Sequence, residues 1–173
     1  AYIDGLKAAG FEGGIVTRFC GHQHRPEWAR ACVSDMAGHS GLDVLFAMVD
    51  GGRSGVSQAC REHGVAQIGN VLNWVERDPQ VFLASAICDS GAALFRAIED
   101  HAHGLLPLGG YRSFGLEEPE LVRLEMGSGV DAASRALVET WAQRLLCGQH
   151  EIHLEYGGPE FALPVTAQEP SLA

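Results

Sequence analysis

Continuous apolar segments alternate with amphipathic ones through the first hundred residues, and this alternation constrains the fold more than any other feature of the sequence. Four short segments are rich in apolar, β-branched or aromatic residues, which is typical of strands covered on both faces of a parallel sheet. They are residues 15–19, 43–49, 65–69 and 81–87. Because parallel strands need a crossover between them, the pattern predicts an α/β fold with a doubly wound, mostly parallel sheet and helices on both faces.

The segments between the strands carry the end signals of helices. We expect these helices over residues 26–38, 54–64 and 90–104. Pro26 suits the first turn of the first helix, Asp89 or Ser90 can cap the third, and a glycine stands where each helix should end. The apolar stripe of the third helix is expected to face inward, onto the core.

The C-terminal part has a different pattern. Residues 108–116 and 120–125 are predicted to form short strands or extended connections. A strongly amphipathic helix is expected over residues 130–147, with Ser128 as its cap. Alternating apolar and polar side chains then predict a half-buried strand or hairpin arm over residues 151–156.

Charge and cysteine content exclude several classes of protein. The 22 acidic residues outnumber the 12 Lys and Arg residues, giving a formal charge of -10. A chain this negative repels phosphate backbones, so we expect no nucleic-acid partner. No apolar run reaches the roughly 18 residues of a membrane helix, so no membrane span is predicted. The five cysteines form no C-x-x-C pair, and neither a disulfide framework nor a structural zinc site is expected.

Polar and ring-bearing side chains gather in four turns that follow the predicted strands. Turns at the carboxyl ends of parallel strands form the crevice that binds ligands in open α/β sheets. The candidate ligand-binding residues in these turns are Gly21, His22, Gln23, Asp50, Gly51, Arg53, Asn70, Asn73, Trp74, Cys88 and Asp89. Amides and imidazoles hydrogen-bond hydroxyl groups and an indole stacks on flat rings, so the set predicts a small polar ligand with a planar part and no cofactor.

Other chemistry in the same turns has weaker support. The glycine-rich turn over residues 50–55 lacks dinucleotide-binding and P-loop spacing, which favours a plain tight turn over a phosphate site. His22 and His24 have no carboxylate or third histidine close in sequence, so no metal is expected. Cys88 would need a histidine such as His22 as a base, and no local signature supports that pairing. An enzyme is therefore the least favoured interpretation.

The order of motifs resembles the basic membrane protein family of solute-binding proteins, which includes purine nucleoside receptors of ABC importers. The resemblance begins with the run L-D-V-L-F-A-M-V-D-G-G-R-S-G-V from residue 42 and continues to residue 69. It extends through the strand and helix of residues 81–104, the glycine-tyrosine stretch of residues 110–116 and the helix of residues 130–147. It thus covers nearly the whole chain.

The resemblance implies a periplasmic-binding-protein type I fold, in which two lobes are hinged around a nucleoside. It also implies an extracytoplasmic protein, often a lipoprotein, that can deliver its ligand to an ABC permease. This chain would supply the second lobe, and the helix over residues 130–147 would pack on the first lobe or on a second chain. The expected parts are an α/β ligand-binding lobe over residues 1–126, a returning helix and strand over 127–164 and a loose tail over 165–173.

Several family positions carry different residues in this chain. The aromatic residue that stacks on the base falls on Gln23, the ribose-binding acid on Val71 and the second acid on Asn73. The glutamine of the same turn falls on Trp74, and the lysine that ends the next motif falls on Cys88. A charged hydrogen bond contributes about 1.5–3 kcal/mol, so the nucleoside signature is weakened. Trp74 would offer a replacement stacking face.

Two hypotheses of different classes follow. The first is non-catalytic binding of a nucleoside-like or other small polar ligand by a receptor or sensor of this family. The second is a ligand-free regulatory or assembly module derived from the fold, motivated by the lost acidic and lysine positions. An enzyme that uses Cys88, or His22 and His24, is a third and less favoured alternative.

Overall fold

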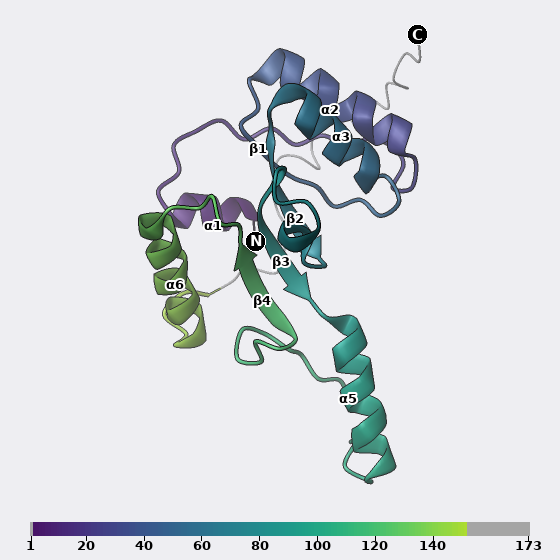
Figure 1. Ribbon diagram of the computed structural model, residues 1–173. Coiled ribbons are helices and arrows are strands. Elements are labelled where there is room, and N and C mark those ends of the chain that lie inside the picture. The colour runs from purple at the N-terminus through teal and green to yellow at the C-terminus, as the bar shows by residue number, and fades with distance from the viewer. Residues whose placement is uncertain (1, 152–173) are drawn as a thin grey trace.

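The computed structural model describes residues 2–151 of the chain (Figure 1). The described part contains one four-stranded sheet. Its strands are β1 (Val44–Phe46), β2 (Ala66–Val71), β3 (Phe82–Cys88) and β4 (Val122–Met126). Its helices are α1 (Tyr2–Ala8), α2 (Pro26–Ser40), α3 (Arg53–His63), α4 (Trp74–Arg77), α5 (Ser90–Ala102) and α6 (Ala132–Leu146).

The sheet has the strand order β1-β2-β3-β4. β1, β2 and β3 run parallel, with Leu45 opposite Gln67 and Gly69 opposite Ser85. β4 pairs antiparallel with β3. The mostly parallel α/β sheet predicted from the sequence is therefore confirmed.

Helices lie on both sides of β1. Side chains alternate between the two faces of a strand, so neighbouring residues of β1 point in opposite directions. Leu45 belongs to the core cluster beneath α2 and α3, whereas the ring of Phe46 stacks on Tyr2 of α1 with centroids 5.1 Å apart. Figure 1 shows α2 and α3 on one side of the sheet and α1 on the other.

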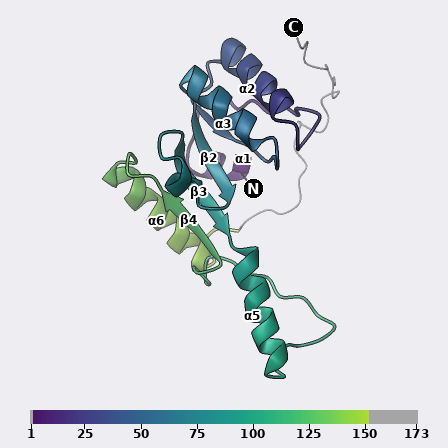
Figure 2. The same ribbon diagram turned by 45° about the vertical axis from the view of Figure 1, so that its right-hand side comes forward.

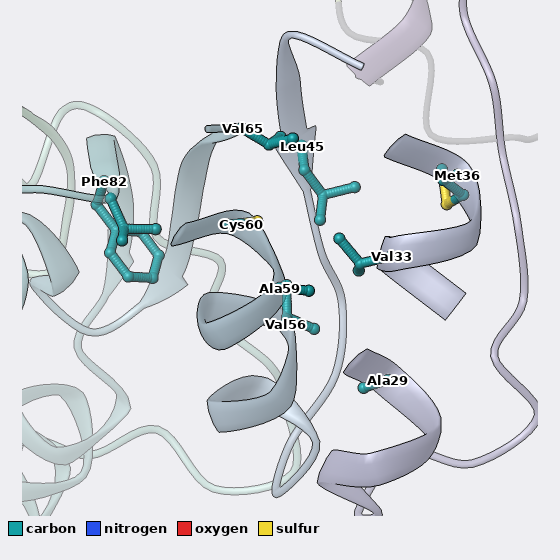
Figure 3. Close-up of a cluster of buried hydrophobic side chains, with 10 residues drawn as sticks. Ala29, Val33, Met36, Leu45, Val56, Ala59, Cys60, Val65 and Phe82 are labelled. Atoms are coloured by element: carbon teal, nitrogen blue, oxygen red, sulfur yellow. The ribbon is translucent and has the colours of Figure 1, made fainter. Parts of the chain in front are cut away.

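The buried core lies between α2, α3 and the parallel strands (Figure 3). Its members are Ala29, Val33, Met36, Leu45, Val56, Ala59, Cys60, Val65, Val81 and Phe82. The two helices approach closely at Gly55, where an added Cβ would lie 1.8 Å from the carbonyl oxygen of Pro26. Any side chain at this position would push α3 away from α2, so the sequence uses glycine.

The third predicted helix forms as α5, but the prediction that its apolar stripe faces inward is wrong. Leu94, Phe95 and Ile98 are 64%, 63% and 58% exposed. Figures 1 and 2 show that α5 extends away from the sheet, so no described element covers this side. Helices α1 and α6 likewise contain no buried residue.

The predicted strand over residues 15–19 is also wrong, because this segment forms no regular element and all of its residues are exposed. A strand is stable only beside a partner that accepts its backbone hydrogen bonds. β1 stands at the end of the strand order, and no described strand pairs with its outer edge. The segment over residues 108–116 consists of turns and irregular backbone and contains no strand.

Other differences concern the ends of elements. α2 continues past Gly38 to Ser40 and is capped by Gly41, whose φ of 58° is left-handed and favours glycine. α6 is capped by Asp131, whose side chain accepts a hydrogen bond from the backbone N–H of Ser134, and not by Ser128.

The sequence does not predict helices α1 and α4. The arm over residues 151–156, apart from its first residue, and the tail over 165–173 lie outside the described residues. None of the helices within residues 2–151 is both long and apolar enough to cross a membrane.

Candidate functional site

The turns that follow β1, β2 and β3 leave the same edge of the sheet. This placement results from the parallel order of the three strands, whose carboxyl ends must coincide. The segment over residues 20–25 joins them through its backbone: the carbonyl oxygen of Gln23 accepts hydrogen bonds from the N–H groups of Asp50 at 3.2 Å and Gly52 at 2.9 Å. The four predicted turns therefore lie along one edge, which we call the ligand edge.

Glycines at positions 51 and 52 allow this close contact. A Cβ at Gly52 would lie 3.0 Å from the carbonyl oxygen of Gln23 and 3.2 Å from the Cβ of Ala29. A Cβ at Gly51 would lie 3.1 Å from the carbonyl oxygen of His24. The pair thus brings the backbone of residues 20–25 against the start of α3.

Arg53, Asn70 and Trp74 form a connected group behind the ligand edge. Arg53 and Asn70 are each only 8% exposed. The Arg53 Nη2 donates to the Asn70 side-chain oxygen and to the Val49 carbonyl oxygen, the latter at 3.2 Å. Trp74 Nε1 donates to the Asn70 carbonyl oxygen at 2.9 Å, and the Arg53 guanidinium carbon lies 4.9 Å from the Trp74 ring centroid. These contacts fix the three side chains relative to one another.

Trp74 is held against the sheet by the residues beneath it. A Cβ at Gly69 would lie 2.7 Å from the indole, so only glycine leaves room for the ring. The buried Ser85 hydroxyl oxygen accepts hydrogen bonds from the N–H groups of Trp74 at 3.0 Å and Val75 at 3.1 Å. The indole also stacks on Phe82 with centroids 5.6 Å apart. Trp74 is half-buried and forms a wall of the site.

The exposed polar side chains of the ligand edge come from residues 22–24 and Asp50. His24 Nδ1 lies 3.9 Å from the Asp50 carboxylate, and these side chains are 65% and 68% exposed. The His22 and His24 rings lie edge to face with centroids 6.0 Å apart. No group of three metal-ligating side chains occurs among the residues that the structure describes. These groups are placed to hydrogen-bond a ligand from solvent.

Three predicted residues have local roles at the ends of elements. The Asn73 side chain accepts from the backbone N–H of Glu76 at 3.3 Å and caps α4, and the Asp89 carboxylate accepts from Ala92 at 2.8 Å and caps α5. Cys88 is exposed at the end of β3. No hydrogen bond joins Cys88 to a histidine within residues 2–151.

Sequence reasoning missed a pocket of about 270 Å³ next to the ligand edge, between α3 and α4. Arg53 and Trp74 line it on the side of the ligand edge, and Arg61, Arg77 and Asp78 line it farther away. Burial lowers the pKa of the Arg53 guanidinium, an effect that the nearby Asp50 opposes. The sequence feature that could have indicated this pocket is the spacing of Arg53, Ser57 and Arg61, which places the three residues on one side of a helix.

Comparisons with known proteins place this geometry in context. The family model described as "ABC transporter substrate-binding protein PnrA-like" matches residues 1–136. The fold is similar to that of an ABC transporter solute-binding protein from Aeropyrum pernix K1, with a TM-score of 0.73 and 18% identity, covering 91% of this chain and 52% of that one.

A second similar structure is a transcriptional activator of the comK gene from Bacillus halodurans. Its TM-score is 0.76 at 19% identity, and the match covers 88% of this chain and 53% of that one. The chain therefore spans about half the length of these two proteins. No curated protein sequence matches it significantly. At these identities the structural likeness concerns the fold alone.

Proposed function

The chain belongs to the family of PnrA-like ABC transporter substrate-binding proteins, and from this premise we propose that it binds a small polar ligand at the ligand edge without changing it chemically. The ligand is nucleoside-like or another small molecule with hydroxyl groups and a planar part. The family membership predicted from the sequence is confirmed. The identity of the ligand and its binding at the ligand edge are what we propose.

One observation carries the proposal. The turns at residues 20–25 and 50–53 are joined by backbone hydrogen bonds to the Gln23 carbonyl oxygen, and the polar side chains of residues 22–24 and Asp50 remain exposed. A rigid backbone that presents free donors and acceptors binds with a small loss of conformational entropy. The carboxylate of Asp50 and the imidazole of His24 are suited to accept and donate hydrogen bonds to ligand hydroxyls.

The proposal includes a second lobe. The chain spans about half of each similar solved structure. Closure of two lobes around the ligand would expel water from the ligand edge. An ABC permease or a sensory partner would recognise the closed form. The exposed sides of α1 and α6 would then lie against the partner lobe. An extracytoplasmic location, usual for this family, is part of the same proposal.

Calorimetric titration tests this function. The chain together with its partner lobe is titrated with a panel of nucleosides and small hydroxylated metabolites. For the ligand that binds, Asp50→Asn should weaken affinity about tenfold, since it removes a charged acceptor worth about 1.4 kcal/mol. Glu99→Gln on α5 is the matched control and should leave affinity unchanged. A flat response to the whole panel would contradict the proposal.

A ligand-free assembly module is the second candidate. The exposed apolar side chains of α5 favour it, because apolar groups gathered on one side of a helix commonly pack against another chain. Here the chain would pair with another chain through its amphipathic helices. Light scattering that shows a monodisperse monomer at high concentration would count against this candidate and leave the ligand-binding function in place.

A further inference from the structure

The pocket between α3 and α4 combines three guanidinium groups with one indole. It has a volume of about 270 Å³. Its lining residues are Arg53, Ser54, Ser57, Arg61, Trp74, Arg77, Asp78 and Phe82. Three positive groups face one carboxylate in a chain whose formal charge is -10. Positive charge is thus concentrated in this pocket while the protein as a whole is acidic.

Arg53 lines this pocket, and one of its hydrogen-bond donors has no partner in the part of the chain that the structure describes. The Arg53 side chain and backbone together are 8% exposed. The Nη1 atom of Arg53 is buried and has no hydrogen-bond partner among the described residues. Its Nη2 already donates to Asn70 and Val49. Burial of the Arg53 charge is costly and the nearby Asp50 offsets only part of that cost, while the unmade hydrogen bond at one nitrogen adds to it. A negatively charged group in the pocket would reduce the cost of burying the charge.

A second buried donor lies behind the pocket wall. Gln67 has no exposed surface, and its Nε2 has no partner within the described part of the chain. Its side-chain oxygen accepts a hydrogen bond of 3.2 Å from Ser57, which lines the pocket. Gln67 does not line the pocket, so its Nε2 adds to the excess of donors around the pocket without contacting a ligand there.

The other two arginines differ in their partners. Arg61 forms an ion pair with Asp78. Arg77 is exposed and forms no ion pair within residues 2–151, and its guanidinium carbon lies 5.4 Å from the Trp74 ring centroid. Arg53 lies 4.9 Å from the same centroid. Both guanidinium groups lie close to the one indole that lines the pocket, and their like charges repel each other. A bound anion would reduce that repulsion.

We propose that this pocket binds the oxyanion group, phosphate or carboxylate, of a small molecule. Planar guanidinium groups match the oxygens of either anion through paired N–H donors. The inference rests on the proposed function, because Arg53 and Trp74 border both the pocket and the ligand edge. It adds that the ligand carries an anionic group, whose place is beside α4, while its polar remainder lies at the ligand edge.

Titration calorimetry at low ionic strength tests the pocket in the full chain. The probes are inorganic phosphate, citrate and uncharged adenosine. Phosphate or citrate should bind, and Arg77→Gln should weaken that binding about tenfold, the effect of one charge-assisted hydrogen bond. Binding of phosphate alone identifies a phosphate group, and binding of citrate alone identifies a carboxylate.

Arg144→Gln is the matched control. Arg144 also lies over an indole, 4.8 Å from the centroid of the Trp141 ring on α6, but it lines no part of this pocket. This substitution changes the net charge equally and should leave anion affinity within about twofold. Arg77→Lys keeps the charge and should retain most of the affinity, which separates loss of charge from a disturbed fold.

Several results would overturn the inference. One is the absence of heat for both anions, and another is equal weakening by Arg77→Gln and Arg144→Gln, which would indicate general charge attraction. Binding of adenosine without either anion would reject the anion pocket and leave the proposed function standing. Anion binding that responds to Arg77→Gln, with no response to any nucleoside, would support the pocket and count against a nucleoside ligand.

Discussion

The region from α2 to β3 and the helices around it differ in what they bury. α2, α3 and the parallel strands enclose the core cluster, with Ala59 and Cys60 wholly buried. α1, α5 and α6 contain no buried residue, although each carries apolar side chains. The first region therefore makes its own core. The helices of the second are at most partly covered by the described residues, and the apolar side chains Leu94, Phe95 and Ile98 of α5 are exposed.

This difference has a consequence for the site. The ligand edge is built on the first region, because residues 20–25 and 50–53 contact α2 and α3 directly. Asp89 caps α5 and thereby links the ligand edge to the start of this helix. The geometry of the site should therefore not depend on whether α5 is covered.

The largest expected contrast is between two phenylalanines. Phe82 is 2% exposed, and Phe95 on α5 is 63% exposed. Phe82→Ala should lower the free energy of unfolding by about 4 kcal/mol, because it leaves a cavity in the core and removes the stacking partner of Trp74. Phe95→Ala should change it by less than about 0.5 kcal/mol. Urea unfolding of the full chain measures both. Equal losses would show that α5 packs on the core.

Two glycines provide the next contrast. Gly55→Ala places a methyl group against the Pro26 carbonyl and should destabilise the chain by about 3 kcal/mol. Gly38 lies within α2 with no other atom within 4 Å of an added Cβ. Gly38→Ala should therefore stabilise the chain by about 0.5–1 kcal/mol through helix propensity. Tolerance of alanine at both positions would mean that α2 and α3 do not approach as described.

The smallest contrast concerns the pH dependence of stability. Burial raises the pKa of the Cys60 thiol from 9.0 to about 11. The folded chain holds this proton more tightly than the unfolded chain, so the contribution to stability is complete below pH 9 and is lost as the pH rises to about 11. Cys60→Ala should reduce the loss of stability between pH 8 and pH 10.5, measured by urea unfolding. Cys147→Ala, which removes an exposed thiol, should leave it unchanged.

The sequence predicts those parts of the fold that depend on local signals. Pro26 marks the start of α2, Gly64 marks the end of α3, and apolar runs mark β2 and β3. The segment over residues 15–19 has the same apolar pattern but forms no strand. A strand depends on a neighbour, and no pattern within the segment reveals whether one is present.

The site is predictable to a similar degree. The rule that ligands bind where parallel strands end places Asp50, Asn70 and Cys88 at one edge, as observed. The pocket beside it was missed because it requires α4, a helix of four residues that is too short to leave a periodic pattern. Unless α4 is predicted, nothing in the sequence indicates that Arg77 lies near Arg53.

Amide hydrogen exchange of the full chain tests most directly whether the α2-to-β3 region is stable by itself and holds the ligand edge. The backbone N–H groups of α3, β2 and β3, together with those of Gly52 and Trp74, should exchange slowly, whereas those of α5 should exchange much faster. Protection of α5 equal to that of α3 in a monomer, or exchange at Gly52 as fast as in α5, would contradict the account.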